Sequence, residues 1–308
     1  VNSISGFIDR REDKIRGLKE SFLYTNEELT SINYSGVTNN SYSINYATGQ
    51  RGNISFKSDL DPNENYNYDA SVNDRIKEIQ NAAIYISQHF NYTTKQYIKD
   101  ITQNYSVSGF SKLSFKYENE EVLRKVDFIE SNTIAGSKFY AGNYALITNS
   151  NGNTIEEQIL INSPDGTVAV YIKNAGGEKI LYIHKDHINS PLLFTRGDGT
   201  IEYEQSFDAW GRKRNPLDWL FDNSTVSSSP IAYGYNFKET YPKFGLINFG
   251  ARVYDPALGR FISCDPLNQF SAISPYAFAL NNPMIYEDPD GRWVWLIMGG
   301  IGAAVNIY

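Results

Sequence analysis

The chain has 308 residues, of which 41% are hydrophobic and 14% aromatic, so it is long enough for one large globular β domain or two smaller ones. Its formal charge of −7, from 28 Lys and Arg against 35 Asp and Glu, excludes the basic footprint of a nucleic-acid-binding domain for this segment. The single cysteine, Cys264, excludes a disulfide framework and a cysteine-based zinc site.

The first residues carry little structural signal. Residues 1–23 include the charged run RREDKIRGLKE, and we expect a lead-in there, either a short helix or an irregular segment. The chain opens on Val1 without an initiator Met or a signal-peptide pattern, and we interpret it as part of a longer protein.

Residues 24–179 show a period in tyrosine. Tyr24, Tyr46 and Tyr68 stand 22 residues apart, and a looser series continues through Tyr92, Tyr117 and Tyr140. Such a period is typical of stacked supersecondary units, and the Gly and Asn turns between the tyrosines favour one β-hairpin per unit. Two alternatives stay open: chance spacing in a chain with 23 tyrosines, and a helix over residues 73–90.

The middle of the chain predicts three further hairpins. The first lies within residues 139–158 around an Asn-Ser-Asn-Gly turn, the second joins 168–172 to 179–184, and the third joins 192–195 to 201–207. The motif Asp208-Ala-Trp-Gly-Arg212 predicts a Trp ring packed under a glycine turn, with an Arg available to pair, and we expect residues 216–230, rich in Ser, to form an exposed loop.

Residues 244–293 contain the highest density of turn-forming residues in the chain. Three Asp-Pro pairs begin there, at Asp255, Asp265 and Asp288. Proline fixes its own φ and pushes the preceding residue out of the helical region, while Asp accepts a downstream backbone N–H, so each pair predicts a turn. Short aromatic and β-branched runs between the turns predict strands only a few residues long.

These residues carry a family resemblance. The run GLINFGARVYDPALGRFISCDP, followed by YAFALNNPMIYEDPDG, resembles the core signature of the Rhs/YD-repeat family, in particular its Bacteroidetes-like members. The upstream run LYIHKDHINSPLLFTRGDGTIEYEQSFDAWGRKRNP resembles another block of the same family, and YATGQRGNISFK and YDASVNDRIKEI resemble weak YD repeats. The blocks cover about residues 180–293.

The resemblance implies an all-β fold in which hairpins join into a continuous curved sheet that spirals into a hollow shell, closed by the core segment. It divides the chain into a lead-in at 1–23, degenerate repeats at 24–179, the core at 180–292 and an enclosed apolar cargo start at 293–308. The implied function is encapsulation and delivery of a C-terminal toxin or effector in interbacterial competition. The implied partners are that cargo, a secretion or delivery machinery and an immunity protein for the cargo, and the implied location is secreted or cell surface.

The same resemblance assigns chemistry to Asp265 and Asp288. In this family and in the related C components of insecticidal Tc toxins, Asp at these positions forms an aspartyl-protease-like pair that cuts its own chain, here between Arg292 and Trp293. One carboxyl holds a proton while the other activates water. The family has Leu where this chain has Arg292, and the Arg charge is expected to keep both carboxyls ionised and silence the pair. The alternative is two structural turns.

Other candidate sites have weaker support. His184 and His187 have a spacing seen in metal sites but lack an evident third ligand, so no metal or cofactor is predicted. A triad of Asp186, His187 and Ser190 would need an unusual turn, and Cys264 is expected to be a small buried residue. No catalysis on external substrates is predicted.

The tail and the overall function leave alternatives open. Residues 293–308 are largely apolar but shorter than the roughly 20 residues that span a bilayer, and we expect them to be buried rather than to begin a membrane segment or another domain. The main alternative function is a cell-surface adhesion or carbohydrate-binding module with exposed Tyr and Trp as sugar platforms, and a weaker one is a free-standing hydrolase.

Overall fold

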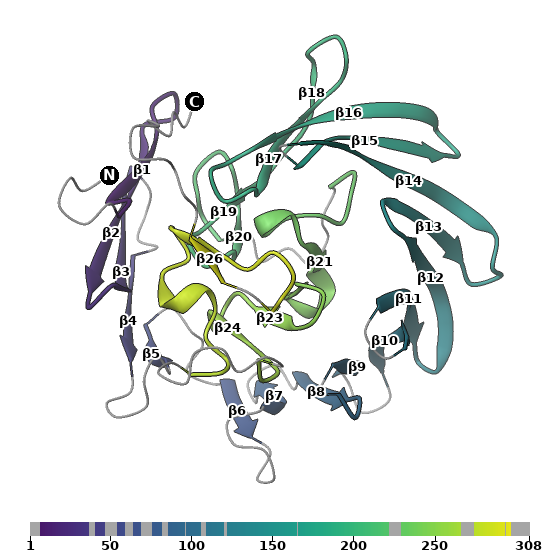
Figure 1. Cartoon of the computed structure of the whole chain (residues 1–308), viewed down its shortest axis with the longest axis horizontal. Coiled ribbons are helices and arrows are strands. Elements are labelled where there is room, and N and C mark those ends of the chain that lie inside the picture. Colours follow the sequence, from purple (N-terminus) through teal and green to yellow (C-terminus); the bar gives the residue numbers. More distant parts are fainter. Residues whose placement is uncertain are drawn as a thin grey trace. The chain divides into compact units, whose positions relative to one another are not determined.

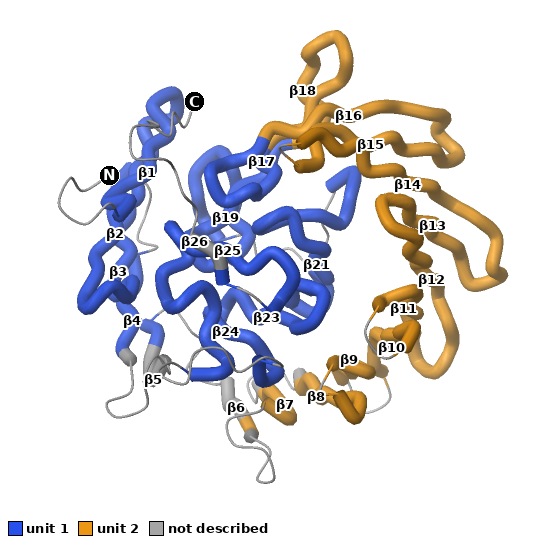
Figure 2. Tube along the Cα trace, viewed as in Figure 1, with its two compact units in different colours: residues 1–61, 185–192, 204–308 blue, residues 62–184, 193–203 orange. Residues whose placement is uncertain are grey.

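A computed structural model describes thirteen stretches of the chain. They are residues 7–36, 41–46, 54–58, 64–68, 76–81, 86–95, 97–105, 109–119, 122–164, 166–221, 229–265, 274–292 and 294–296. The chain divides into two compact units (Figure 2). Unit 1 comprises residues 1–61, 185–192 and 204–308, and unit 2 comprises residues 62–184 and 193–203.

Unit 2 is built from a long antiparallel sheet. Its thirteen strands are β6 (Glu64–Tyr68), β7 (Ile76–Asn81), β8 (Ile86–Tyr92), β9 (Ile98–Asn104), β10 (Phe110–Glu118), β11 (Val122–Glu130), β12 (Thr133–Ala141), β13 (Tyr144–Asn149), β14 (Thr154–Ser163), β15 (Gly166–Asn174), β16 (Gly177–Lys185), β17 (Pro191–Thr195) and β18 (Ile201–Glu204). Each strand lies beside its neighbours in sequence, and β6 to β16 follow a curved path in Figure 1. The predicted all-β fold of hairpins in a curved sheet is confirmed for this unit.

Unit 1 begins with a second sheet in chain order. It contains β1 (Arg10–Asp13), β2 (Leu18–Thr25), β3 (Glu28–Ser35), β4 (Tyr42–Tyr46) and β5 (Ile54–Lys57). Strands therefore start within the stretch for which a short helix or irregular lead-in was expected. Alternating burial along β2 explains why, because Leu18, Glu20 and Phe22 all point into the unit.

The rest of unit 1 consists of very short elements. They are β19 (Ser206–Phe207), β20 (Lys213–Arg214), η1 (Tyr235–Phe237), β21 (Glu239–Tyr241), η2 (Pro242–Phe244), β22 (Leu246–Asn248), β23 (Val253–Asp255), β24 (Arg260–Phe261), η3 (Ala279–Asn281), β25 (Tyr286–Glu287) and β26 (Trp295–Leu296), where η is a 3-10 helix. The Asp turns act as predicted at Asp255 and Asp288, whose Oδ1 atoms accept N–H groups two to four residues downstream. One continuous sheet therefore does not run through this region, because turns interrupt every strand.

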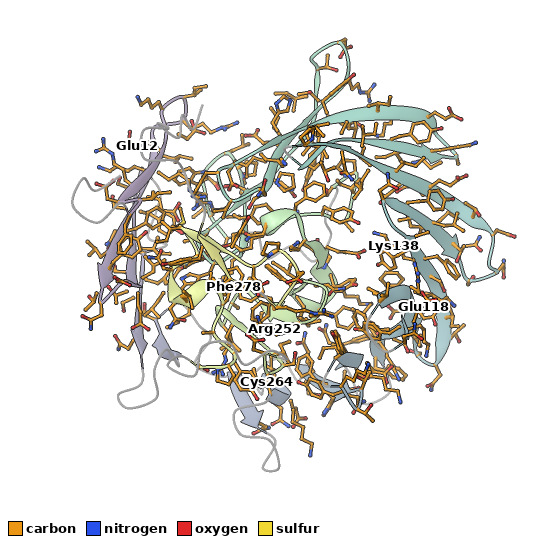
Figure 3. The ribbon with its side chains drawn as sticks, viewed as in Figure 1. Glu12, Glu118, Lys138, Arg252, Cys264 and Phe278 are labelled. Carbon is orange, nitrogen blue, oxygen red and sulfur yellow. The ribbon has the colours of Figure 1, made fainter. Side chains whose placement is uncertain are left out.

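Aromatic rings replace long strands as the core of this region. Phe249, Tyr254, Phe261 and Phe278 are buried, and the centroids of their rings lie 4.4 to 5.7 Å apart. Phe278 of this cluster is labelled in Figure 3. Such ring pairs are favourable beyond the area that they bury.

The spacing of the tyrosines in the sequence matches the spacing of the hairpins in the structure. Each tyrosine of the series lies at or next to the end of an even-numbered strand from β2 to β12. A β-bulge falls beside five of them, at Tyr24, Tyr46, Tyr68, Tyr92 and Tyr117. The phenol of Tyr92 donates to the Ile76 carbonyl at 2.6 Å, and that of Tyr117 donates to the Ile98 carbonyl at 2.9 Å.

Three details differ from the sequence prediction. Residues 76–81 and 86–90 are strand, which excludes a helix over 73–90, and both strands pair with sequence neighbours. In the predicted exposed loop at 216–230, Leu217 is 63% exposed, but Trp219 is buried against the guanidinium of Arg214. Residues 222–228 of that loop lie outside the described residues.

The Trp ring of the Asp208 motif packs against a glycine turn, as predicted, and that turn lies elsewhere in the chain. Tyr235, not Trp210, covers Gly211, where an added Cβ would lie 2.6 Å from the Tyr235 ring. Trp210 instead lies against Gly259. The sequence alone does not identify which glycine the ring meets, because Gly259 is far from Trp210 in the chain.

The apolar tail is described only in part. β26 pairs with β25, while Trp293 and residues 297–308 lie outside the described residues. Among the described residues, no helix is long and apolar enough to cross a membrane.

Candidate functional site

A buried arginine stands between the two aspartates of the predicted pair. Arg252 precedes β23, and its side chain is 2% exposed. Its Nη2 lies 2.8 Å from Oδ2 of Asp288, and its Nη1 lies 3.8 Å from Oδ2 of Asp265. Its guanidinium also stacks on the Phe261 ring, with 3.7 Å between Cζ and the ring centroid. The structure therefore brings Asp265 and Asp288 to one cation.

The same arginine holds the turn that precedes the predicted cleavage site. Arg252 Nε donates to the carbonyl of Gly291 at 2.5 Å. Asp288 Oδ1 accepts the N–H groups of Gly291 at 2.7 Å and of Arg292 at 3.0 Å. Gly291 has a φ of +77°, and an added Cβ would lie 2.9 Å from the amide nitrogen of Arg252, so only glycine fits. Asp288 thus contacts the residue on the amino side of the predicted cut.

The charges of this cluster do not cancel. Two carboxyls face one guanidinium, which leaves a net charge of about −1 if all three are ionised. Burial raises the pKa of Asp288 above its ordinary value, although Arg252 and the Gly291 N–H act in the opposite direction. Burial likewise lowers the pKa of Arg252. Burial therefore favours the protonated form of Asp288, while its ion pair with Arg252 favours the ionised form.

Asp265 is held by its backbone and lies beside the cysteine. Its N–H donates to the carbonyl of Pro275 at 2.9 Å. Burial, and then the charge of Asp265, raises the pKa of the Cys264 thiol. The thiol form is favoured, which is unsuited to a nucleophile. Trp293, on the carboxyl side of the predicted cut, lies outside the described residues.

Sequence reasoning named Arg292 as the cation beside the pair and missed Arg252. Arg252 is 36 residues from Asp288 in the sequence, and nothing local pairs them. One signal was available: an Arg inside the largely apolar run Leu246 to Tyr254 predicts a buried cation that needs a carboxylate partner.

The remaining candidate residues have structural contacts. Asp186 Oδ1 accepts the N–H groups of Ile188 and Ser190, which makes a tight turn rather than a triad. His187 Nε2 lies 3.1 Å from the Met284 carbonyl, and His184 Nε2 lies 3.0 Å from the Thr195 hydroxyl. The described part of the chain contains no group of three or more His, Cys, Asp or Glu that could hold a metal.

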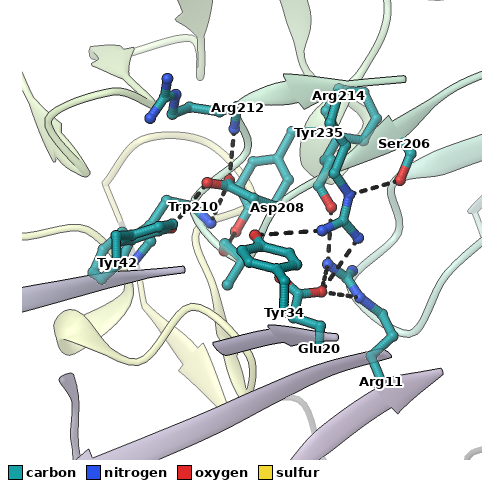
Figure 4. A network of polar contacts seen from close by, with 12 residues as sticks. Arg11, Glu20, Tyr34, Tyr42, Ser206, Asp208, Trp210, Arg212, Arg214 and Tyr235 are labelled. Carbon is teal, nitrogen blue, oxygen red and sulfur yellow. Dashed lines mark hydrogen bonds and ion pairs between the residues drawn. The ribbon is translucent and has the colours of Figure 1, made fainter. Parts of the chain in front are cut away.

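A second buried charge cluster lies within unit 1 and was also missed (Figure 4). Glu20 of β2 has a fully buried side chain, and its Oε2 lies 2.6 Å from Arg11 and 3.2 Å from Arg214. Arg214 also donates from Nε to the Ser206 hydroxyl. Tyr42 of β4 donates to Asp208 Oδ2 at 2.9 Å. These contacts join the β1 to β5 sheet to residues 206–214 of the same unit.

Comparisons with known proteins identify relatives for part of the chain. No protein-family model matches it. Salivary gland surface protein 1 of Aedes aegypti is 44% identical over 154 residues, which cover 48% of this chain and 4% of that protein. Toxin protein Tse5 of Pseudomonas aeruginosa is 30% identical over 132 residues, which cover 42% of this chain and 9% of that protein.

Solved structures extend the comparison to the fold. A crystal structure of TcdB2-TccC3 matches with a TM-score of 0.62 at 21% identity and covers 89% of this chain and 14% of that one. The chain therefore spans only a small share of each of these proteins. In sequence it is similar to a toxin protein and in fold to TcdB2-TccC3, which agrees with the resemblance to Rhs-type and Tc-type toxin components.

Proposed function

We propose that this chain forms part of the wall and the closing segment of an Rhs-type shell that encapsulates a toxin or effector and helps to deliver it. The observation that carries the proposal is the thirteen-stranded sheet in chain order, because sequential hairpins extend a wall without leaving long strand edges inside it. The similarity to Tse5 and to TcdB2-TccC3 supports it. The cargo begins near Trp293, and the protein is secreted or displayed at the cell surface.

The proposed partners follow from this role. They are the chain's own C-terminal cargo, the machinery that secretes or delivers it, and an immunity protein that neutralises the cargo. The Bacteroidetes-like branch of the family is the proposed origin, since the core motifs resemble that branch most.

Limited proteolysis of the full-length parent protein tests encapsulation. Residues 294–305 are expected to resist protease in the native particle, because enclosure removes an apolar segment from solvent. The control is the same digestion after denaturation, in which these residues are cut. Rapid native cleavage within 294–305 would contradict enclosure.

We further propose that Asp265 and Asp288 are a self-cleavage pair that Arg292 has silenced. In the reaction, water attacks the Arg292 carbonyl carbon and loses a proton to one carboxyl, while the other protonates the Trp293 nitrogen as the C–N bond breaks. Burial raises the pKa of Asp288, which favours a proton on that carboxyl. The backbone N–H of Arg292 donates to Asp288 Oδ1 at 3.0 Å, so this residue is adjacent to the pair, and its positive charge would favour the ionised carboxyls.

Denaturing mass spectrometry of freshly purified parent protein tests the pair. The wild type is expected to be intact, and Arg292→Leu is expected to be split between residues 292 and 293. Asp265→Asn or Asp288→Asn added to Arg292→Leu should restore the intact chain. A wild type that is already split, and that Asp265→Asn protects, would show that Arg292 does not silence the site. An Arg292→Leu variant that stays intact favours two structural turns.

A further inference from the structure

A network of hydrogen-bonded side chains lies on one face of strands β6 to β9 in unit 2, which are neighbours in the sheet (Figure 1). Glu78 of β7 lies directly opposite Asn67 of β6 on one side and His89 of β8 on the other. Ser87 of β8 lies directly opposite Asn104 of β9. Directly opposed residues of antiparallel strands project from the same face, and so do residues two apart in one strand. The register therefore brings a serine, a histidine and a carboxylate together.

These three side chains contact one another in the order of a hydrolytic triad. His89 Nδ1 lies 3.2 Å from Oε1 of Glu78. His89 Nε2 lies 3.2 Å from the hydroxyl oxygen of Ser87. The imidazole thus has the carboxylate on one ring nitrogen and the hydroxyl on the other, which is the arrangement by which a base activates a serine nucleophile.

Chemistry fixes the direction of each hydrogen bond in the network. An ionised carboxylate only accepts, so in the neutral imidazole Nδ1 carries the proton and Nε2 is the acceptor. The hydroxyl of Ser87 must then donate to Nε2 of His89. Its oxygen accepts from Asn104 Nδ2 at 3.2 Å, which agrees with this direction. Asn67 Nδ2 donates to Oε2 of Glu78 at 3.1 Å and holds the carboxylate in place. His89 Nε2 is therefore the atom that can take the serine proton.

Two side-chain amides flank the serine. Gln80 of β7 and Asn104 of β9 lie directly opposite Ser87 on its two sides. Each amide group carries two N–H donors, and donors beside a nucleophile stabilise the negative oxygen that forms when it attacks a carbonyl. Gln80 is exposed, and the side chain of His89 is 43% exposed. A substrate in solution can therefore reach the hydroxyl and its flanking donors.

We propose that Ser87, His89 and Glu78 form an esterase site that hydrolyses small carboxylic esters. The Ser87 oxygen attacks the ester carbonyl carbon while its proton passes to His89 Nε2, and His89 gives this proton to the alcohol as the C–O bond breaks. Water then attacks the acyl-serine and loses a proton to His89, which returns it to the Ser87 oxygen as the carboxylic acid leaves. Glu78 is a positioning residue, because it contacts only the base.

The open sheet face favours esters over peptide bonds. An alcohol leaves more readily than an amine, so an ester needs less stabilisation of the oxyanion than an amide does. Exposed amide side chains supply that stabilisation only in part, since water competes for the same donors. The proposed site is independent of encapsulation and of self-cleavage.

Labelling of the complete parent protein with diisopropyl fluorophosphate tests the nucleophile. This reagent phosphorylates a serine that a neighbouring base activates. Peptide mass spectrometry is expected to find Ser87 modified in the native wild type, and unmodified in the denatured wild type and in His89→Gln. This measurement does not require that a Ser87 variant folds.

Hydrolysis of p-nitrophenyl acetate by the same protein measures turnover. Ser87→Ala and His89→Gln are each expected to lower kcat/KM by about tenfold or more. Glu78→Gln is expected to lower kcat with little change in KM, because the substrate does not touch this residue. His184→Gln is the matched control. His184 Nε2 lies 3.0 Å from the Thr195 hydroxyl, but within the described residues it has no carboxylate partner, so this change should leave the rate unaltered.

Circular dichroism shows whether each variant keeps its sheet. A native wild type without label on Ser87 would overturn the proposal. So would a folded Ser87→Ala variant that hydrolyses the ester at the wild-type rate, or a His184→Gln variant that loses as much activity as His89→Gln. Each of these results would assign the network to stabilising strands β6 to β9 alone.

Discussion

Glu20 and Arg252 are single residues on which long stretches of chain depend. Glu20 is bonded to Arg214, 194 residues away, and Arg252 is bonded to Asp288, 36 residues away. Sequence patterns predict which residues are buried and where turns fall, because those depend on neighbours. They do not reveal which buried charge meets which, because that depends on how distant segments pack.

Glu20→Gln is expected to destabilise the protein by roughly 3–5 kcal/mol near neutral pH, because it leaves Arg11 and Arg214 buried without their carboxylate. Chemical denaturation followed by fluorescence measures the loss. Glu12→Gln is the matched control, since its partner Arg10 is largely exposed and the change should cost less than about 1 kcal/mol.

The stability lost in Glu20→Gln is expected to depend on pH. Burial alone would raise the pKa of Glu20, but the ion pairs with Arg11 and Arg214 hold it below its ordinary value. A depressed carboxyl pKa contributes stability that is present above the unfolded pKa and is lost as pH falls through the folded one. The difference in unfolding free energy between wild type and Glu20→Gln should therefore shrink below about pH 4.5. A difference that stays constant down to pH 3 would contradict the ion pairs.

At the scale of the element, the hairpin is closed by its tyrosine. In the hairpins of Tyr92 and Tyr117 a bulge lies beside the tyrosine, and its hydroxyl donates to the backbone carbonyl of the first residue of the preceding strand. The tyrosine period can therefore be recognised in the sequence although the Asp of the Tyr-Asp motif has mostly been replaced. The hydrogen bond that stabilises the hairpin comes from the phenol and does not involve the residue that follows it.

Tyr117→Phe removes one such hydrogen bond and leaves the ring in place. We expect a loss of about 0.5–1.5 kcal/mol in the free energy of unfolding, because the Ile98 carbonyl loses its partner. Urea denaturation measures it. Tyr105→Phe, which loses an exposed 3.3 Å hydrogen bond to Glu130, is expected to be close to neutral, and equal losses in the two variants would argue against a special role for Tyr117.

Two glycine-to-alanine substitutions distinguish the cost of steric crowding from the cost of a left-handed backbone. At Gly259, with φ +73°, a Cβ would lie 2.7 Å from the buried Trp210 ring, whereas at Gly142, with φ +63°, it would meet nothing within 4 Å. Gly142→Ala should cost about 1 kcal/mol from its backbone alone, and Gly259→Ala at least about 1–3 kcal/mol more. Thermal melts compare the two, and similar melting temperatures would show that Trp210 yields easily.

At the scale of the whole chain, the features that depend on residues close in sequence could be predicted, and those that depend on distant residues could not. Hairpins at residues 139–158 and 168–184 are predicted from turns of a few residues and are present in the structure. The third, predicted to join 192–195 to 201–207, is present as far as Glu204, because Ser206 and Phe207 pair with β20 instead. The ring cluster and the two charge clusters were not, because their members come from segments separated by many turns. The aspartate pair was identified through the family resemblance, and its cation was not.

A sheet whose strands pair only with their sequence neighbours has a consequence for how the protein is made. Every new strand finds its partner in the hairpin just completed, so a nascent chain leaving the ribosome can extend the sheet one hairpin at a time without waiting for distant residues. The short elements after Glu204 differ, because they pack on β1 to β5, which are synthesised much earlier. Glu20 and Tyr42 of that sheet bind Arg214 and Asp208 and obtain these partners only when residues 206–214 have been made. Residues 206–214 thus complete the burial of strands that are synthesised well before them.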